Sequence, residues 1–195
     1  MAQARRAWRT EVDGVGGISP ERLVFLDECG VLTTLSRLHG RSPRGTRAWA
    51  SAPFGHWTRV TLLGALGAEG IVGAMSVEAA TSGAVFCAYL EQVLLPELRR
   101  TKPDAGLIMD NLPAHKAPRV RARLERSGFA YRYLPAYSPD LNPIEPGWAK
   151  LKAALRRLAA RTVDALHAAC GPALAAITAQ DAAGFFRHCG YSRPS

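Results

Sequence analysis

The sequence lacks the features of a membrane protein and of a disulfide-bonded secreted protein. No apolar run approaches the roughly 20 residues that a membrane-spanning helix needs, because Arg, Glu, Pro or Gly interrupts each one. No apolar segment of a secretory signal follows the basic N-terminus, Met1–Arg9. The four cysteines are scattered and form no Cys-x-x-Cys pair, so we expect reduced thiols. These absences favour a cytoplasmic protein with no membrane partner.

Signatures of covalent catalysis and of zinc binding are also missing. There is no Ser/His/Asp or Cys/His arrangement that would indicate a protein nucleophile. The spacing of His167, Cys170, His188 and Cys189 matches no common zinc finger, so we interpret these as buried thiols and helix histidines. We find no internal repeat, and no helix-turn-helix pattern precedes the first predicted strand.

Positive charge is what the sequence has in excess. The 195 residues, enough for one domain with a hydrophobic core, include 25 Lys and Arg against 16 Asp and Glu, a formal net charge of +9. This excess indicates an anionic partner, with nucleic acid the leading candidate and an anionic membrane surface the rival.

Basic residues gather in three segments: a Gly/Pro/Arg-rich excursion over 37–58 and two predicted helices. A charge run is usually just a solvated helix face. Both helices, however, follow candidate acids, so they could line a track for a phosphate backbone. We expect DNA contacts from Arg41, Arg44, Lys116, Arg119, Lys150, Lys152, Arg156 and Arg157.

Hydrophobic periodicity predicts an α/β fold with a mixed five-stranded sheet and helices on both faces. Residues 1–20, with several glycines and Pro20, are interpreted as a linker, and residues 21–191 as one domain that includes C-terminal helices from about 162. Pro96 is expected to kink or restart one helix. The predicted strands cover 22–28, 59–66, 71–77, 105–110 and 129–134, and the predicted helices cover 83–100, 114–127, 143–160 and, as a pair, 162–188.

Three acids stand at the ends of predicted core elements. Asp27 ends the run Leu23–Leu26, Asp110 ends Leu107–Met109, and Glu145 lies in a turn-rich lead into a helix. Each acid also has a purely structural interpretation. Asp27 could end a strand, Asp110 could form a turn, and Glu145 could be the capping-box carboxylate of a helix that Asn142 caps. Taken together, acids of this kind suit hard divalent cations, which prefer oxygen ligands.

Two motifs carry a family resemblance. Asp110-Asn111-Leu112-Pro113-Ala114-His115 and Ser138-Pro139-Asp140-Leu141-Asn142-Pro143-Ile144-Glu145, with 34 residues between Asp110 and Glu145, resemble the catalytic core of DDE transposases. The match is to the mariner-type superfamily, closest to its bacterial insertion-sequence branch. The opening Val24-Phe25-Leu26-Asp27-Glu28 and the closing Phe186-Arg187-His188-Cys189-Gly190-Tyr191 also look like that branch.

The resemblance implies an RNase H-like fold in which Asp27, Asp110 and Glu145 are the catalytic acids and hold two Mg²⁺ ions, with Mn²⁺ as substitute. It implies cleavage of double-stranded DNA at transposon ends, strand transfer into target DNA, and a homodimer in the DNA complex. Full family members carry N-terminal helix-turn-helix modules, so a separate or frameshift-fused helix-turn-helix subunit is a further expected partner. The alternatives are an inactive or regulatory DNA-binding remnant and another RNase H-like nuclease.

Several neighbours of the acids are expected to support them. Asn111, His115 and Asn142 are candidates for a second layer around the metal site or for helix capping. Glu28 is adjacent to Asp27 but points to the opposite face of the predicted strand, so we treat it as secondary. The side chains of Trp49, Trp57 and Trp148 are expected to pack in the core.

Overall fold

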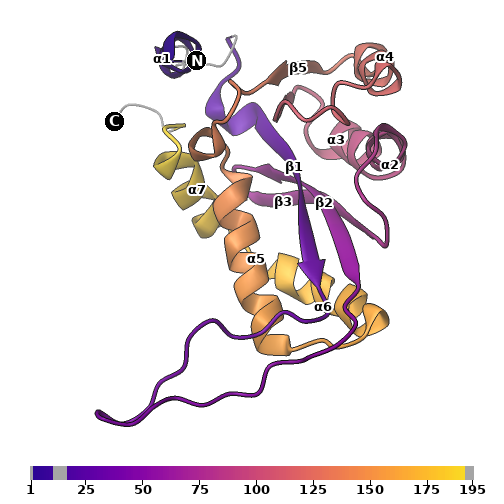
Figure 1. The fold of residues 1–195 in the computed structure, drawn as a ribbon. Helices are drawn as coiled ribbons and strands as arrows, with labels where there is room; N and C mark the ends of the chain where they lie inside the picture. The colour runs from indigo at the N-terminus through magenta and orange to yellow at the C-terminus, as the bar shows by residue number, and fades with distance from the viewer. Residues whose placement is uncertain (1, 11–16, 192–195) are drawn as a thin grey trace.

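A mixed five-stranded sheet forms the centre of the molecule. The computed structural model describes residues 2–10 and 17–191. The strand order is β3-β2-β1-β4-β5, with β1 antiparallel to β2 and parallel to β4 (Figure 1). This is the sheet that the sequence predicts. Its strands are β1 (Leu23–Leu32), β2 (Arg59–Gly67), β3 (Gly70–Val77), β4 (Gly106–Met109) and β5 (Ala130–Tyr133).

One face of the sheet is covered by α2 (Gly83–Tyr89), a π-helical turn (Leu90–Leu94), α3 (Leu95–Thr101) and α4 (Pro118–Ser127). The Ser82 hydroxyl accepts a hydrogen bond from the Val85 amide and so caps α2 as predicted. Near Pro96 the helical path continues through the π-helical turn. Proline has no N–H group to donate to the preceding turn, so the regular helical hydrogen-bond pattern is interrupted here. The π-helical turn is the form that the predicted kink or restart takes.

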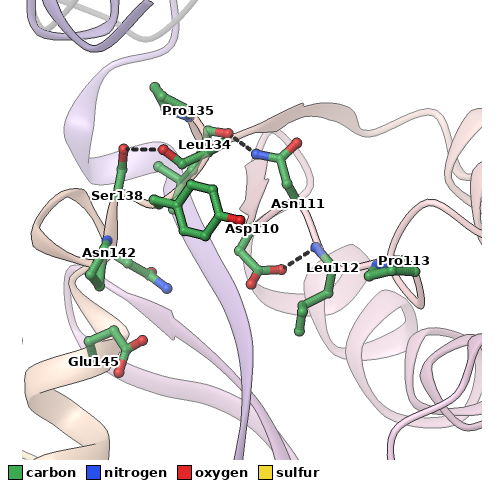
Figure 2. A pocket seen from close by; sticks show the side chains of 12 residues that line it. Asp110, Asn111, Leu112, Pro113, Leu134, Pro135, Ser138, Asn142 and Glu145 are labelled. Carbon is green, nitrogen blue, oxygen red and sulfur yellow. Dashed lines mark hydrogen bonds between the residues drawn. The ribbon is translucent and has the colours of Figure 1, made fainter. Parts of the chain in front are cut away.

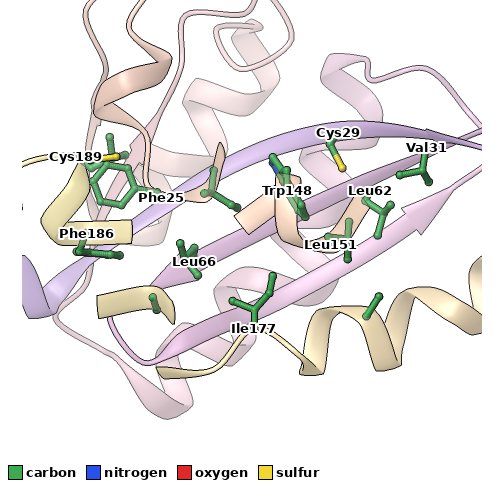
Figure 3. Close-up of a cluster of buried hydrophobic side chains, with 14 of the residues drawn as sticks. Phe25, Cys29, Val31, Leu62, Leu66, Trp148, Leu151, Ile177, Phe186 and Cys189 are labelled. Carbon is green, nitrogen blue, oxygen red and sulfur yellow. The ribbon is translucent and has the colours of Figure 1, made fainter. Parts of the chain in front are cut away.

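The other face is covered by α5 (Ile144–Leu158), α6 (Val163–Ala175) and α7 (Ala179–His188). Figure 3 shows Phe25, Trp148 and Phe186 within the hydrophobic cluster between these helices and the sheet. The Thr178 hydroxyl and the Asp181 carboxylate form the predicted capping box of α7. Single 3₁₀ turns, Pro20–Arg22 and Pro139–Leu141, precede β1 and α5.

The predicted linker over residues 1–20 is corrected for its first half. Residues Ala2–Thr10 form helix α1, whose Trp8 side chain is 5% exposed. The Trp8 indole Nε1 donates a hydrogen bond to the Tyr191 hydroxyl at 2.8 Å. The helix forms because one large apolar side chain reaches the core, a tertiary contact that local composition does not reveal.

The helix predicted over 114–127 begins later, at Pro118. Ala117 has an extended backbone (ψ 141°) because the residue before a proline is disfavoured in the helical region. Amide-to-carbonyl bonds from His115 to Leu112 and from Lys116 to Pro113 instead form tight turns after β4.

Residues 33–58 form a long excursion without helix or strand, which extends away from the sheet (Figure 1). The Trp49 side chain is 82% exposed and the Trp57 side chain 58% exposed, so the expectation that these two pack in the core is wrong. Trp148 is buried as expected. Within residues 2–10 and 17–191, no helix combines the length and apolarity needed to cross a membrane.

Candidate active site

Strand register brings Asp27 and Asp110 together. Leu26 of β1 pairs with Met109 of β4 in the parallel ladder, so the next residues along both strands are Asp27 and Asp110. Adjacent strands lie about 4.8 Å apart. Because side chains alternate across a strand, both acids leave the sheet on the face shared with Phe25 and Ile108, where α5 packs.

Glu145 reaches the same place from the first turn of α5. Figure 2 shows Asp110 and Glu145 facing one pocket, with Asn142 near them. This pocket has a volume of about 440 Å³, and its other walls come from the loop after β4 and the loop after β5. The Asn142 Nδ2 donates to Asp27 Oδ2 at 3.3 Å, which places the 6%-exposed Asp27 directly behind this wall.

The Asp27 carboxyl is buried near several other carboxylates, and this environment changes its pKa. Burial, and next the Glu145 carboxylate, raise the pKa of Asp27 to about 8, and Asp110 and Glu28 act in the same direction. The Glu28 amide donates to Asp27 Oδ1 at 2.8 Å and opposes this rise. Burial and the neighbouring carboxylates therefore disfavour the ionised form of Asp27 at neutral pH.

His115 connects carboxylates that belong to opposite faces of the sheet. Its fully buried ring places Nδ1 2.7 Å from Asp110 Oδ1 and Nε2 2.8 Å from Glu28 Oε2. The Nδ1 contact is an ion pair without the alignment of a hydrogen bond, whereas the Nε2 contact is a hydrogen bond. Burial alone would lower the pKa of His115, but the two carboxylates together raise it to about 9. His115 is therefore an imidazolium that fixes both carboxylates.

Asp110 is held in its ionised form. Burial acts to raise its pKa, but contacts from His115 and from the Leu112 amide, at 3.0 Å from Asp110 Oδ1, outweigh burial and lower the pKa below its usual value. The pKa of Asp27 is thus raised and that of Asp110 lowered, although the two residues follow directly after the paired residues of neighbouring strands.

Two of the three predicted supporting residues lie at the pocket, and the third, His115, is buried and contacts Asp110. Asn111 and Asn142 line the pocket directly. The Asn111 side chain donates to the Leu134 carbonyl and so ties the loop after β4 to the end of β5 (Figure 2). Asn142 does not cap α5 with its side chain, because its amide turns toward Asp27. The buried Oδ1 of Asn142 has no hydrogen-bond partner among the described residues and remains available as an oxygen ligand for a cation.

The structure separates the predicted DNA-contact residues. Lys150 of α5 forms an ion pair with Asp181 of α7, and Lys116 lies 5.1 Å from the centre of the Tyr133 ring. Four of the other predicted contact residues are exposed, namely Arg41, Arg44, Arg119 and Arg157. The last two, Lys152 and Arg156 of α5, are half-buried.

Two parts of the site are not predictable from the sequence patterns above. Glu28 points to the opposite face of β1 and was expected to be secondary, yet His115 reaches that face and bridges it to Asp110. The available signal was a histidine five residues after Asp110. Arg5 of α1 contacts the loop before α5, and no pattern in the sequence indicates this contact.

The donor set suits a hard divalent cation. Three carboxylates converge from three elements, one has its pKa raised by burial and by the neighbouring carboxylates, and the Asn142 oxygen is buried without a partner in the described structure. In the arrangement seen over residues 2–10 and 17–191, no three His, Cys, Asp or Glu side chains lie close enough to enclose an ion. Binding of an ion by Asp27, Asp110 and Glu145 would therefore require their side chains to draw closer together.

The sheet order, the helices on both faces and the acids on the neighbouring strands β1 and β4 define an RNase H-like α/β domain with an acidic pocket. Comparison with known proteins agrees. Residues 22–167 match the family described as DDE superfamily endonuclease, and the chain belongs to that family. The search of curated proteins finds no match.

Solved structures share the fold. A Mos1 transposase paired-end complex with the left transposon end superposes with a TM-score of 0.77 at 19% identity, over 96% of this chain and 57% of that one. The Mos1 transposase catalytic domain with Raltegravir and Mg gives a TM-score of 0.72 at 18% identity, over 96% and 87% of the two chains. This chain thus spans little more than half of the Mos1 chain in the paired-end complex.

Proposed function

We propose that this chain is the catalytic domain of a DDE transposase that cleaves DNA strands at transposon ends and transfers them into target DNA. The observation that carries the proposal is the position of Asp110 and Glu145 at one pocket, with Asp27 behind its wall, in a chain of the DDE family. The sequence motifs favour the bacterial insertion-sequence branch. A cytoplasmic location follows from the same assignment.

Two Mg²⁺ ions, replaceable by Mn²⁺, are the cofactors we propose. When bound, such ions lower the pKa of an attacking water or 3′-hydroxyl and stabilise the leaving oxygen. Mos1 structures with Mg and with Mn support this choice. The residues of this chain orient the site: His115 fixes Asp110, and Asn142 positions Asp27.

The proposed partner is double-stranded DNA, bound by a homodimer, with a helix-turn-helix subunit, separate or fused by frameshifting, that recognises the transposon ends. The Mos1 complex with a transposon end supports the DNA partner. The +9 formal charge supports it independently, because a phosphate backbone attracts a basic protein.

Asp110→Asn tests the proposal. We expect the substitution to abolish Mg²⁺-dependent strand cleavage, because it removes a carboxylate ligand but keeps the shape of the side chain. Fold and DNA affinity should remain near those of the parent protein, as measured by circular dichroism and a binding titration. Asp104→Asn, at an exposed aspartate that pairs with Arg22, is the matched control and should retain cleavage. Unchanged cleavage by a pure Asp110→Asn preparation contradicts the assignment.

A further inference from the structure

Helix α1 grips the loop that leads into α5. This loop, residues 136–142, lines the pocket between β5 and Glu145. The guanidinium of Arg5 contacts the loop directly. Arg5 Nη1 donates to Ser138 Oγ at 2.8 Å and to the Tyr137 carbonyl at 3.2 Å, and Nη2 donates to Asp140 Oδ2 at 2.6 Å.

A second connection from α1 reaches the same loop through the end of the domain. The Trp8 Nε1 donates to the Tyr191 hydroxyl, which in turn donates to the Leu141 carbonyl at 2.7 Å. The Tyr191 ring also packs on Phe25, with ring centroids 4.9 Å apart, two residues before Asp27 in β1. The helix is therefore tied to the loop and, through Tyr191, to the strand that carries Asp27.

The gripped loop is strained. Tyr137 has a φ of 53°, which is uncommon for a bulky residue and persists only where surrounding contacts hold it. Its side chain is 88% exposed, so ring packing does not supply that hold. Arg5 contacts the Tyr137 carbonyl and the next side chain, Ser138, which is 5% exposed.

The loop sets the position of two groups at the acidic site. Leu141 and Asn142 follow Asp140 directly in the chain. The side-chain amide of Asn142 donates to Asp27. The backbone amide of Glu145 donates to the backbone carbonyl of Asn142 at 3.1 Å. A shift of the loop would therefore displace Asn142 and Glu145 together. Misplacement by about 1 Å can cost on the order of 100-fold in rate.

We propose that Arg5 is a positioning residue, which clamps the loop 136–142 so that Asn142 and Glu145 face Asp27 and Asp110. This inference rests on the proposed function for its effect on catalysis. The clamp itself is a property of the metal-free protein. An exposed ion pair such as Arg5–Asp140 adds little to global stability, so loss of the clamp should alter the site without unfolding the domain.

The test compares Arg5→Ala with Arg22→Ala. Arg22 also donates to a carbonyl and pairs with a carboxylate, both of Asp104, but at the ends of β1 and β4 that precede the acids. Both variants lose one positive charge. Arg5→Lys keeps the charge and loses the planar two-armed contact, so it should restore DNA affinity but not the full rate.

Hydrogen exchange of the metal-free proteins is the first measurement. The amides of Leu141, Asn142 and Glu145 bond within the loop and the first turn of α5, and we expect them to exchange roughly tenfold faster in Arg5→Ala. Amides of β1 should exchange as in the parent protein. Equal exchange of the loop in Arg5→Ala and Arg22→Ala overturns the clamp.

Cleavage kinetics with saturating Mg²⁺ are the second. We expect kcat to fall roughly 10- to 100-fold in Arg5→Ala, with KM for DNA changed no more than in Arg22→Ala. A change in KM alone overturns the positioning role and makes Arg5 a DNA contact. If the parent protein cleaves no DNA, the proposed function fails, and the exchange comparison still decides whether Arg5 holds the loop.

Discussion

At the scale of single residues, the acids at the pocket differ in what holds them. Asp110 is ionised by His115, which is itself fixed by Glu28. The pKa of Asp27 is raised to about 8 by burial first, then by Glu145, with Asp110 and Glu28 acting in the same direction. At neutral pH the protein alone thus disfavours the ionised form of one of these acids.

Asp27→Asn should stabilise the metal-free protein at neutral and alkaline pH. The folded-state pKa of about 8 lies above the unfolded value near 3.8, so the folded state binds more protons between these limits, and stability falls as pH rises from about 4 to 8. The asparagine side chain does not ionise, so the substitution removes this fall in stability. We expect a higher Tm at pH 8 and little difference at pH 4, at about 2–4 °C for each kcal/mol gained.

The measurement is a thermal melt between pH 4 and pH 9 in the presence of a chelator. Glu125→Gln, at an exposed residue of α4, serves as control and should track the parent protein. The buried Asn142 can turn its Oδ1 toward the new amide, which exchanges one unpaired atom of Asn142 for the other and adds none. A Tm gain of equal size at pH 4 and pH 8 would show that relief of charge is not the cause.

At the scale of elements, α5 must lie close against the sheet to present Glu145. The position that allows this is Gly64 of β2, which pairs with Asp27 in the antiparallel ladder. A Cβ atom there would stand 2.6 Å from Cη2 of Trp148. Trp148 belongs to α5, three residues after Glu145, and its ring is buried in the core (Figure 3).

Gly64→Ala should therefore push Trp148 and the start of α5 away from the sheet. Overpacking of this kind costs about 1–3 kcal/mol. We expect that loss in urea denaturation, together with a loss of cleavage larger than the loss of folded protein explains. Gly184→Ala in α7, where a Cβ would meet no atom within 4 Å, is the control. It should be neutral or stabilising by about 0.5–1 kcal/mol. Full activity of a folded Gly64→Ala variant would contradict this account.

The elements that the sequence predicts well are those whose signals are local. Strands β1 and β4 read as apolar runs, and α7 shows its capping box, because neighbouring residues fix both features. The start of α4 differs from the prediction because the effect of Pro118 on Ala117 overrides the helical pattern before it. Helix α1 and the Glu28–His115 pair could not be predicted because each depends on contacts between residues far apart in the chain.

At the scale of the whole molecule, the positive charge is spread over separate surfaces. The excursion over residues 33–58, which carries exposed arginines, extends away from the sheet (Figure 1), while Lys150 on α5 is neutralised in part by Asp181. Trp49 and Trp57 share the excursion and are exposed. The excursion is therefore the basic segment that is most open to an extended anionic partner.

We expect the double substitution Arg41→Ala/Arg44→Ala to weaken DNA binding and to reduce its salt dependence. Each phosphate contact contributes a slope of about −0.9 to log K against log salt, so loss of two contacts should flatten the slope by roughly 1.8. Binding to duplexes of different sequence should weaken equally, because phosphate contacts carry no sequence information. The measurement is a titration of labelled duplex DNA at several salt concentrations.

Arg99→Ala/Arg100→Ala supplies the matched control for that titration. It removes the same charge from exposed positions near the end of α3, and Arg100 is already paired with Glu97. If overall charge alone drew the protein to DNA, both double variants would weaken binding by similar amounts and with similar slopes. A flatter slope only in Arg41→Ala/Arg44→Ala would place the excursion on the DNA, whereas equal slopes would remove these two arginines from the contact surface.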